Sequence, residues 1–419
     1  MSPTTTHARV IIQNDLLSSS EVEEILDNML KETKTSGVLL NYDVIPECGP
    51  TGYLGEYFHL QLKYQLKNSN EIKKTRMFIK SLPYQNPEMT AFIEGCGMLV
   101  KEAAIYERLL NELRKLTPTI WCAQCYFTRH DLFVMQNIAD MGYEPIQNPG
   151  EFLTKSQMDM LFKSLATMHA CSIIYEVKYQ VNIGEQLKDV LREMTVSPNV
   201  RFYTAGVKAI LAVARIHPKY QSNELQNFIA ESLPRKLDTV YEMMNPSNDY
   251  RNVFCHRDLW SGNLFYHKSQ PDKVSVVLVD YQLARYSPPA IDVLMVVYLN
   301  ITPEQRYTMK GWCYDTYYRY FADELKQQEL EPEQEISRVE FEKSLKALEL
   351  WGALYNCISA TILRVPGDYL KNLKLNHPDV FYRYTNVDRV KEVLELLEVD
   401  DKFKDYMFEC VDEMLQSLL

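Results

Sequence analysis

The sequence contains no long run of apolar residues, and this absence excludes several classes of protein. Residues 1–7 are polar, and the apolar stretch at residues 10–12 is too short for the core of a signal peptide. No stretch reaches the roughly 18 apolar residues that a membrane-spanning helix requires. We therefore expect a cytoplasmic protein without a membrane span.

The chain also lacks an excess of positive charge. Its 45 Lys and Arg residues are outnumbered by 56 Asp and Glu residues, which gives a net charge of −11. Nucleic acids and anionic membranes attract basic surfaces, so we expect neither as the main partner. The acidic C-terminal residues could attract a polyamine, but a solvated helix face is the favoured explanation.

Paired cysteines are scarce as well. The nine cysteines are an odd number and lie scattered along the chain, which favours free thiols in a reducing compartment. Cys122 and Cys125 form the only close pair. A zinc site would need a second pair nearby, so two ordinary thiols are favoured over a metal or redox site.

A short string of polar residues carries the chemistry. His256 is followed two residues later by Asp258, and Asn263 comes five residues after that. This spacing is typical of the catalytic loop of an ATP-dependent kinase, in which the Asp accepts a hydroxyl proton and the Asn holds magnesium. Asp280, at the end of an apolar strand, would be the second magnesium ligand. We therefore predict ATP and Mg²⁺ as cofactors.

The segment between these residues is predicted to be a hairpin. Residues 264–267 form a short strand pattern, residues 268–273 a polar turn and residues 274–279 a β-branched, buried strand. Such a hairpin would return Asp280 towards Asn263, as phosphoryl transfer requires. The alternative is a chance match in which His256 and Asp258 merely cap a turn.

The strings H-R-D-L-W-S-G-N at residues 256–263 and D-Y-Q-L-A-R-Y-S-P-P-A-I-D at residues 280–292 resemble the ecdysteroid-kinase-like family. These insect and nematode proteins are related to choline kinases and aminoglycoside phosphotransferases. The resemblance extends from about residue 43 to the C-terminal helices. It implies an α+β, bilobed protein-kinase-like fold, with a small β-rich N-terminal lobe at residues 1–138 and a large, mainly helical C-terminal lobe at residues 139–419.

The resemblance also implies a phosphate-binding region in the N-terminal lobe. Gly49, Gly52 and Gly55 lie where a kinase covers the ATP phosphates, although their spacing fits a plain hairpin turn equally well. Lys80, on a strand pattern, would bind the α- and β-phosphates. Lys73 and Lys74 are the alternatives, but they lie in a polar stretch.

Two further elements complete the predicted nucleotide site. Glu102, on a predicted helix, is expected to pair with Lys80, with Glu107 as the alternative. Backbone groups of Gln136 and Ile138 would bind adenine where the lobes join. Family members usually carry acidic residues at Gln136 and the position after it, so this chain departs from the pattern there.

Other residues are assigned structural roles. His169 lies on an apolar helical face, where a hydrogen-bonded core histidine is favoured over a catalytic role. His256 is expected to organise the catalytic loop, while Arg285 and Asp292 are expected to brace the loop after Asp280. Arg257 replaces the Gly usual in small-molecule kinases, and nothing in the resemblance explains it.

Periodicity predicts the remaining elements. Strands are expected at residues 38–45, 57–66 and 76–80 and twice within 126–135. Helices are expected at residues 21–27, 90–115, 155–174, 184–194, 205–215, 222–243, 291–300, 305–326, 337–362 and 388–418, with a loop at 326–335.

Together these patterns predict a monomeric, ATP- and Mg-dependent O-kinase that acts on a small-molecule alcohol. By resemblance, the acceptor is an ecdysteroid or another lipophilic or xenobiotic hydroxyl compound. A choline-, ethanolamine- or aminoglycoside-like kinase is one alternative, and a non-catalytic ligand-binding protein on a kinase scaffold is another. Aromatic residues such as Trp351 and Tyr355 would wall the acceptor pocket, or simply pack in the core.

Overall fold

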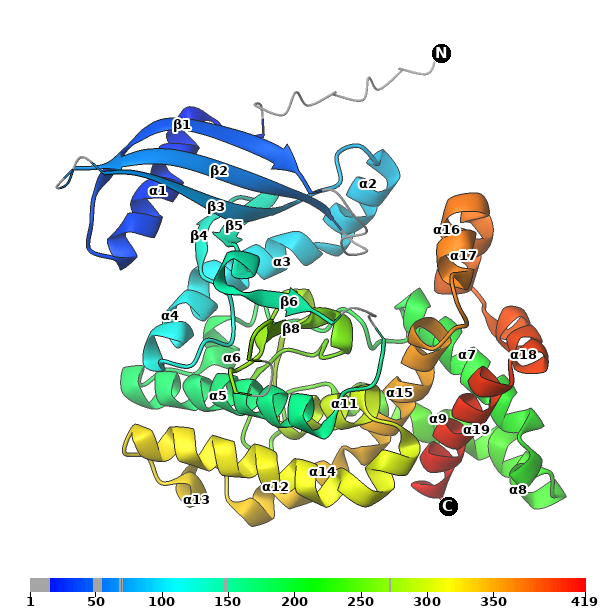
Figure 1. The fold of residues 1–419 in the computed structure, drawn as a ribbon. Helices are drawn as coiled ribbons and strands as arrows, with labels where there is room; N and C mark the ends of the chain where they lie inside the picture. The colour runs from blue at the N-terminus through cyan, green and yellow to red at the C-terminus, as the bar shows by residue number, and fades with distance from the viewer. Residues whose placement is uncertain (1–15, 48–54, 68, 70, 147–149, 271–272) are drawn as a thin grey trace. The chain divides into compact units, whose positions relative to one another are not determined.

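The computed structural model describes residues 16–47, 55–67, 69, 71–146, 150–270 and 273–419, which form two compact units (Figure 1). The first unit comprises the described residues up to Glu144, together with His267–Ser269 and Val279–Gln282. The second comprises the remainder. The predicted lobe boundary between residues 138 and 139 stays a prediction, and the chain leaves the first unit after Glu144.

A five-stranded antiparallel sheet forms the centre of the first unit. Its strand order is β1-β2-β3-β5-β4. The strands are β1 (Gly37–Pro46), β2 (Glu56–Leu66), β3 (Ile72–Ser81), β4 (Cys125–Thr128) and β5 (Leu132–Gln136). Side chains alternate between the two faces, so buried Ile79 points to one face and its neighbour Lys80 to the other.

Helix α1 (Ser19–Glu32) supplies the apolar cover for one face of this sheet (Figure 1). The helix begins at a capping box, in which Ser18 and Glu21 each bond to the other's backbone N–H. Its apolar side chains pack with those of the strands to form one core cluster, which includes Val22, Ile25, Leu26, Leu30, Leu60, Leu62, Met77, Ile79 and Val134.

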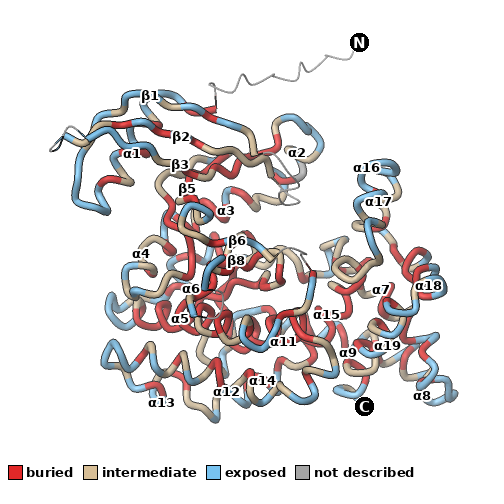
Figure 2. The backbone as a smooth tube through the Cα atoms, in the orientation of Figure 1, coloured by how far each residue is buried: buried red, intermediate tan, exposed pale blue. Residues whose placement is uncertain are grey.

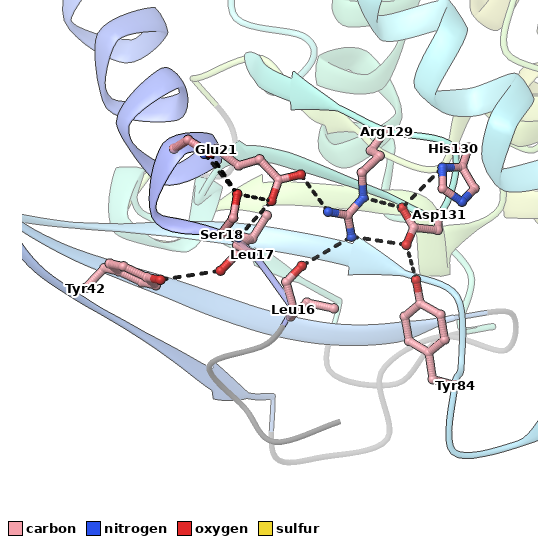
Figure 3. Close-up of polar contacts among 10 residues, drawn as sticks. Leu16, Leu17, Ser18, Glu21, Tyr42, Tyr84, Arg129, His130 and Asp131 are labelled. Carbon is pink, nitrogen blue, oxygen red and sulfur yellow. Dashed lines mark hydrogen bonds and ion pairs between the residues drawn. The ribbon is translucent and has the colours of Figure 1, made fainter. Parts of the chain in front are cut away.

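A polar cluster around Arg129 joins α1 to the turn between β4 and β5 (Figure 3). Arg129 lies 2.6 Å from both Glu21 and Asp131 and donates to the carbonyl of Leu16. Asp131 also accepts a hydrogen bond from the hydroxyl of Tyr84. Burial would raise the pKa of Asp131, but the hydrogen bonds from Arg129 and Tyr84, together with the charge of Arg129, lower it.

We expect Arg129→Ala to lower the free energy of unfolding by about 1–3 kcal/mol, because it leaves two half-buried carboxylates without their cation. Urea denaturation at pH 7 measures this. Lys115→Ala is the control, because Lys115 forms an exposed ion pair with Glu112 one helical turn away and should cost no more than about 0.5 kcal/mol. Equal losses in the two variants would contradict the prediction.

The single helix predicted at residues 90–115 is wrong in its continuity. The segment consists of α2 (Pro87–Cys96), α3 (Met98–Ile105), a π-helical turn (Tyr106–Leu110), α4 (Asn111–Leu113) and a 3-10 turn (Arg114–Leu116). Gly97 separates α2 from α3 at a left-handed φ of 68°, a conformation that favours glycine. A 3-10 turn (Ile138–Met141) and β6 (Tyr143–Pro145) follow β5.

The second unit is mainly helical and is organised around a helix with no exposed residue. All eleven residues of α11 (Ala290–Asn300) are buried, and Figure 2 shows this helix in the buried interior of the unit. The long helices α5 (Lys155–Tyr179) and α12 (Pro303–Gln327) pack against each other, and α15 (Glu349–Leu363) packs on α11. A helix that is apolar all round requires such surroundings.

The second unit contains further α-helices. They are α6 (Ile183–Gln186), α7 (Arg201–Ile216), α8 (Asn223–Asn227), α9 (Leu233–Asp238), α10 (Val240–Met243), α13 (Pro332–Glu335), α14 (Arg338–Ala347), α16 (Tyr369–Asn376), α17 (Pro378–Asn386), α18 (Val390–Val399) and α19 (Asp401–Gln416). The β-rich first unit and mainly helical second unit confirm the predicted α+β class.

Several predicted elements are shorter or divided. Helix α6 ends at Gln186, so the predicted helix at 184–194 is wrong beyond its first turn. The helix predicted at 222–243 consists of several pieces, and those at 337–362 and 388–418 are interrupted at Leu348 and Asp400. The loop predicted at 326–335 contains α13, while α16 and α17 were not predicted.

Short strands frame the loop that carries the kinase-like motif. Strand β7 (Val253–Cys255) pairs with β10 (Arg285–Ser287), and neither was predicted. The predicted hairpin exists as β8 (Leu264–His267) and β9 (Val277–Leu278), with β9 shorter than expected. Leu264 pairs with Leu278, so the chain enters and leaves this hairpin at the same end.

Candidate active site

In the first unit, a buried ion cluster gathers three residues that the sequence singles out. The ammonium of Lys80 on β3 lies 2.6 Å from a carboxylate oxygen of Glu102 on α3 and 3.1 Å from Oδ1 of Asp280. The other oxygen of Glu102 accepts a hydrogen bond of 3.0 Å from the backbone N–H of Tyr281. Glu102 therefore fixes both Lys80 and the residue that follows Asp280.

Burial and charge act in opposite directions on this cluster. Burial alone would lower the pKa of Lys80, but Asp280 and Glu102 raise it above its usual value. Burial raises the pKa of Glu102, and the Lys80 ammonium opposes that rise. Lys80 thus stays protonated and can bind phosphate oxygens, which carry the same charge as its present partners.

The alternatives to these residues lie elsewhere. Lys73 and Lys74 are exposed on β3, and Lys73 is 3.6 Å from Glu71. Glu107 is also exposed, on the π-helical turn. The structure therefore pairs Lys80 with Glu102, and the functional roles of these two residues stay predictions.

Two aromatic rings pack against Tyr281, the residue that follows Asp280 in the cluster. Its ring meets those of Tyr106 and Trp121 edge to face, at centroid distances of 5.7 and 6.5 Å. Asp280 itself has a left-handed φ of 69°, which is uncommon for a residue other than glycine. Strain of this kind is kept where neighbouring contacts hold the backbone in place, as Glu102 and these rings do here.

The glycine cluster is only partly described. Gly49 and Gly52 lie outside the described residues, so their predicted contact with phosphates stays a prediction. Gly55 lies just before β2, and a Cβ atom added there would come within 3.2 Å of the carbonyl oxygen of Ser81. A side chain at this position would therefore crowd β3 next to Lys80.

The predicted adenine-binding segment begins at the end of β5. Gln136 pairs with Met77 of β3, and Ile138 opens a 3-10 turn that is capped by the Asn137 side chain. The Nδ2 atom of Asn137 lies 3.5 Å from Nδ1 of His59, whose Nε2 atom contacts a carboxylate oxygen of Glu47. These contacts order the segment, and adenine binding by Gln136 and Ile138 stays a prediction.

In the second unit, hydrogen bonds fix the loop that carries the motif. The Nδ1 atom of His256 accepts from the backbone N–H of Asp258 at 3.2 Å. The side-chain amide of Asn263 donates to the carbonyl of Asp258 at 2.9 Å and to its Oδ2 atom at 2.8 Å. His256 and Asn263 thus hold Asp258 from both sides, and Asp258 remains half-buried.

Asp292 is the anchor of this loop. Its two carboxylate oxygens accept from the backbone N–H groups of His256 at 2.6 Å and Arg257 at 2.9 Å. We expected Asp292 to brace the loop after Asp280. That expectation is wrong, because the Asp292 carboxylate bonds to the backbone just before Asp258. At the other end of the loop that carries the motif, Asn300 of α11 donates to the carbonyl of Leu259 at 2.7 Å.

His169 on α5 supports Asp292 from behind. It lies 3.3 Å from Oδ2 of Asp292 and 2.8 Å from the hydroxyl of Tyr317, and it is fully buried. The prediction of a hydrogen-bonded core histidine is confirmed. Cys255 lies near both His169 and Asp292, but its thiol donates to the carbonyl of Ser287 at 3.3 Å, and this donor set would not suit Mg²⁺.

Arg257 lies in a buried cluster that the sequence did not reveal. Its guanidinium stacks over the ring of Trp351 at 4.3 Å and lies 3.3 Å from Oε2 of Glu193, which is 3.7 Å from Arg285. Arg285 also donates to the carbonyls of Leu191 and Met244. Arg285 therefore stabilises the segment around Glu193. Its predicted role in bracing the loop after Asp280 stays a prediction.

The electrostatics of Glu193 follow from these two cations. Burial would raise the pKa of Glu193, but Arg257 and Arg285, together with backbone N–H groups, lower it to about 2. Glu193 is thus ionised at neutral pH. Its sequence neighbours carry no motif, so only the folded chain identifies it.

The oxygen atoms needed for a magnesium ion are present on the predicted ligands. Both contacts of Asn263 with Asp258 use the Nδ2 group of Asn263, so its side-chain oxygen takes no part in them. Asp280 contributes a carboxylate, one oxygen of which is 3.1 Å from Lys80. Carboxylate and amide oxygens suit Mg²⁺, so the residue types fit the ion.

The cysteine pair is more consistent with packing than with chemistry. Cys122 and Cys125 are buried free thiols, and burial raises the pKa of each to about 12. All cysteines among the described residues are free. Among the described helices, none is long and apolar enough to cross a membrane.

Among the comparisons with known proteins, the match to a protein family is the informative one. The model of the ecdysteroid kinase-like family matches residues 51–330, which is more than half of the chain. Among curated proteins, none matched this sequence.

Solved structures with distant likeness include an ethanolamine kinase from Plasmodium vivax, at 10% identity and a TM-score of 0.39 over 92% of this chain and 82% of that one. Another is a choline/ethanolamine kinase family protein from Mesorhizobium loti, at 11% identity and a TM-score of 0.32 over 90% and 92%. A third is the aminoglycoside phosphotransferase APH(3'')-Id from Streptomyces rimosus, at 11% identity and a TM-score of 0.31 over 74% and 92%. With scores this low, the family match carries the assignment.

Proposed function

The chain belongs to the ecdysteroid kinase-like family, and from this premise we propose that it transfers the γ-phosphate of ATP to a hydroxyl group of a small molecule. Family membership supports the coarser statement, a small-molecule phosphotransferase. The dependence on ATP and Mg²⁺ and the nature of the acceptor are the proposed refinements.

The observation that carries the proposal is the buried cluster of Lys80, Glu102 and Asp280. Lys80 is protonated, buried and held by two carboxylates. Burying these charges costs free energy of desolvation, so we expect the cluster to have a function. In a kinase that function is to bind the α- and β-phosphates. Glu102 would keep Lys80 in place, and Asp280 would exchange its contact with Lys80 for a magnesium ion.

The motif in the second unit supplies the groups for proton transfer. Asp258 would accept the proton of the acceptor hydroxyl as the new O–P bond forms and the bond to the β-phosphate breaks, which releases ADP. Asn263 would hold Mg²⁺ with Asp280, and the ion, when bound, would neutralise the charge of the phosphates. His256 would act through its hydrogen bond to the amide of Asp258, and not as an acid or base.

We propose a lipophilic alcohol as the acceptor, either an ecdysteroid or a plant or xenobiotic hydroxyl compound. The family description names ecdysteroids, and this description supports the choice of a lipophilic alcohol. Phosphorylation would give such a molecule a negative charge and so inactivate or retain it.

A phosphorylation screen tests this function. The protein is incubated with ATP and Mg²⁺ and, separately, with ecdysteroids, plant phenolics and amino alcohols, and products are detected by the mass gain of one phosphate. We expect a product from at least one lipophilic alcohol and none when Mg²⁺ is removed with EDTA.

Two outcomes would contradict the proposal. Products from amino alcohols alone would indicate a choline- or aminoglycoside-like kinase. No product from any acceptor, together with ATP binding that does not depend on Mg²⁺, would indicate a non-catalytic binding protein.

A further inference from the structure

The starting point is the environment of the Arg257 side chain in the second unit. Its guanidinium lies 4.3 Å from the centre of the Trp351 ring and 3.3 Å from the Glu193 carboxylate. Only 2% of Arg257 is exposed, although it directly precedes Asp258. A cation is therefore held between an indole face and a carboxylate, next to the residue proposed to accept the proton.

An indole face and a carboxylate are also the two groups that bind an ammonium ion. Aromatic faces attract quaternary ammonium groups through the ring quadrupole, and a nearby carboxylate adds a charge of opposite sign. In this protein both groups are already engaged by Arg257. A second cation, Arg285, lies 3.7 Å from the same carboxylate, so Glu193 is shared between two arginines.

The cluster lies close to the proposed reaction centre. The ring of Tyr355 packs on Trp351 at 4.5 Å, and both residues belong to α15. Burial, followed by the charge of Asp258, raises the pKa of the Tyr355 hydroxyl. Both rings are buried, so this aromatic pair belongs to the same buried cluster as Arg257, the residue before Asp258.

We infer that Arg257 fills an internal cation site beside the catalytic loop, so that the acceptor must be an uncharged alcohol and cationic amino alcohols are excluded. This inference rests on the proposed kinase function and narrows its substrate class. A cationic acceptor would find no free indole face and no unpaired carboxylate at this place, and it would be repelled by Arg257 and Arg285.

The backbone at position 257 provides a way to empty the site. Arg257 has a left-handed φ of 71°, which a glycine adopts without strain and an asparagine tolerates. Arg257→Gly removes the guanidinium, leaves Glu193 balanced by Arg285 and opens one face of Trp351. Arg257→Asn does the same with a smaller void and serves if the glycine variant does not fold.

The test compares choline with 3,3-dimethyl-1-butanol, which has the same shape and the same hydroxyl but no charge. Their dissociation constants are measured by calorimetry with the unmodified protein, Arg257→Gly, Arg257→Asn and the double variant Arg257→Gly/Trp351→Leu. We expect the unmodified protein to favour the neutral alcohol. Emptying the site should shift the ratio of the two constants towards choline by at least about tenfold, and loss of the Trp351 ring should reverse most of this shift.

Binding is measured without turnover, so the result is separate from that of the phosphorylation screen. If no acceptor is phosphorylated but the ratio shifts as expected, the kinase function fails and the cation site stands. The inference is overturned if the unmodified protein binds choline as tightly as its neutral analogue. It is also overturned if neither single variant changes the ratio more than twofold, or if the shift persists without Trp351.

Discussion

Asp258→Asn should lower turnover by about 10²–10⁴-fold while leaving the binding of ATP and Mg²⁺ nearly unchanged. Asparagine keeps an oxygen that can accept the hydrogen bond from Asn263, now 2.8 Å in length, so the loop should retain its shape. It cannot take up a proton at neutral pH. Lys80, which is proposed to bind the phosphates, and Glu102, which holds Lys80, belong to the other unit and are not altered.

The measurement combines steady-state turnover with nucleotide affinity for the same protein sample. Asp315→Asn is a matched control, because Asp315 is exposed and its partner Arg338 lies far along the sequence from the motif. The control should keep full activity. A variant Asp258→Asn that turns over ATP and acceptor at the normal rate would show that another group takes the proton.

Glu193→Gln should lower the free energy of unfolding by about 3 kcal/mol at pH 7 and by much less at pH 3. The glutamine keeps an oxygen for the backbone N–H groups of Thr195 and Val196 but loses the charge that Arg257 and Arg285 share. The change leaves two buried cations without a counter-charge, and this accounts for the size of the effect.

The pH dependence follows from the direction of the pKa shift. Glu193 has a pKa of about 2 in the folded protein against an ordinary value of 4.5, so its contribution to stability is fully present above about pH 4.5. It is lost as the pH falls from there towards 2, because the carboxylate must be protonated. Urea denaturation between pH 7 and pH 3 measures the difference between the variant and the unmodified protein.

A control variant separates this effect from a general loss of acidic residues. Glu112→Gln removes an exposed carboxylate paired with Lys115 and should change stability by no more than about 0.5 kcal/mol at any pH. A loss for Glu193→Gln that is equally large at pH 3 and pH 7 would mean that packing, and not charge, explains the contribution of Glu193.

Local sequence patterns predicted those elements whose conformation depends mainly on their own residues. Alternation in β2 and β3 and the 3.6-residue period of α5 correspond to observed elements. The helix predicted across residues 90–115 failed at Gly97, where a left-handed φ ends α2 and starts α3. At residues 187–194, the Glu193 side chain accepts from the backbone N–H groups of Met194, Thr195 and Val196, which provides a local alternative to a helix.

In the candidate site, too, the local pattern could be predicted and the tertiary contacts could not. The spacing of His256, Asp258 and Asn263 lies within one loop, so the sequence contains the whole pattern, and the hydrogen bonds between them follow from that loop. The contacts of Arg257 with Glu193 and Trp351 join segments far apart in the chain. No local pattern marks such pairs, because each partner has ordinary neighbours and only tertiary folding brings them together.

The apolar face that α1 places on the sheet has a practical consequence for recombinant work. The family match begins at residue 51 and ends at residue 330, which would suggest these limits for a shortened protein. A fragment with those limits would lose α1 and β1 and so leave Leu60, Leu62, Met77 and Ile79 uncovered. It would also lose α15 with Trp351. Such a fragment should aggregate on expression, and the natural N-terminal and C-terminal segments should be kept in any crystallisation or screening trial.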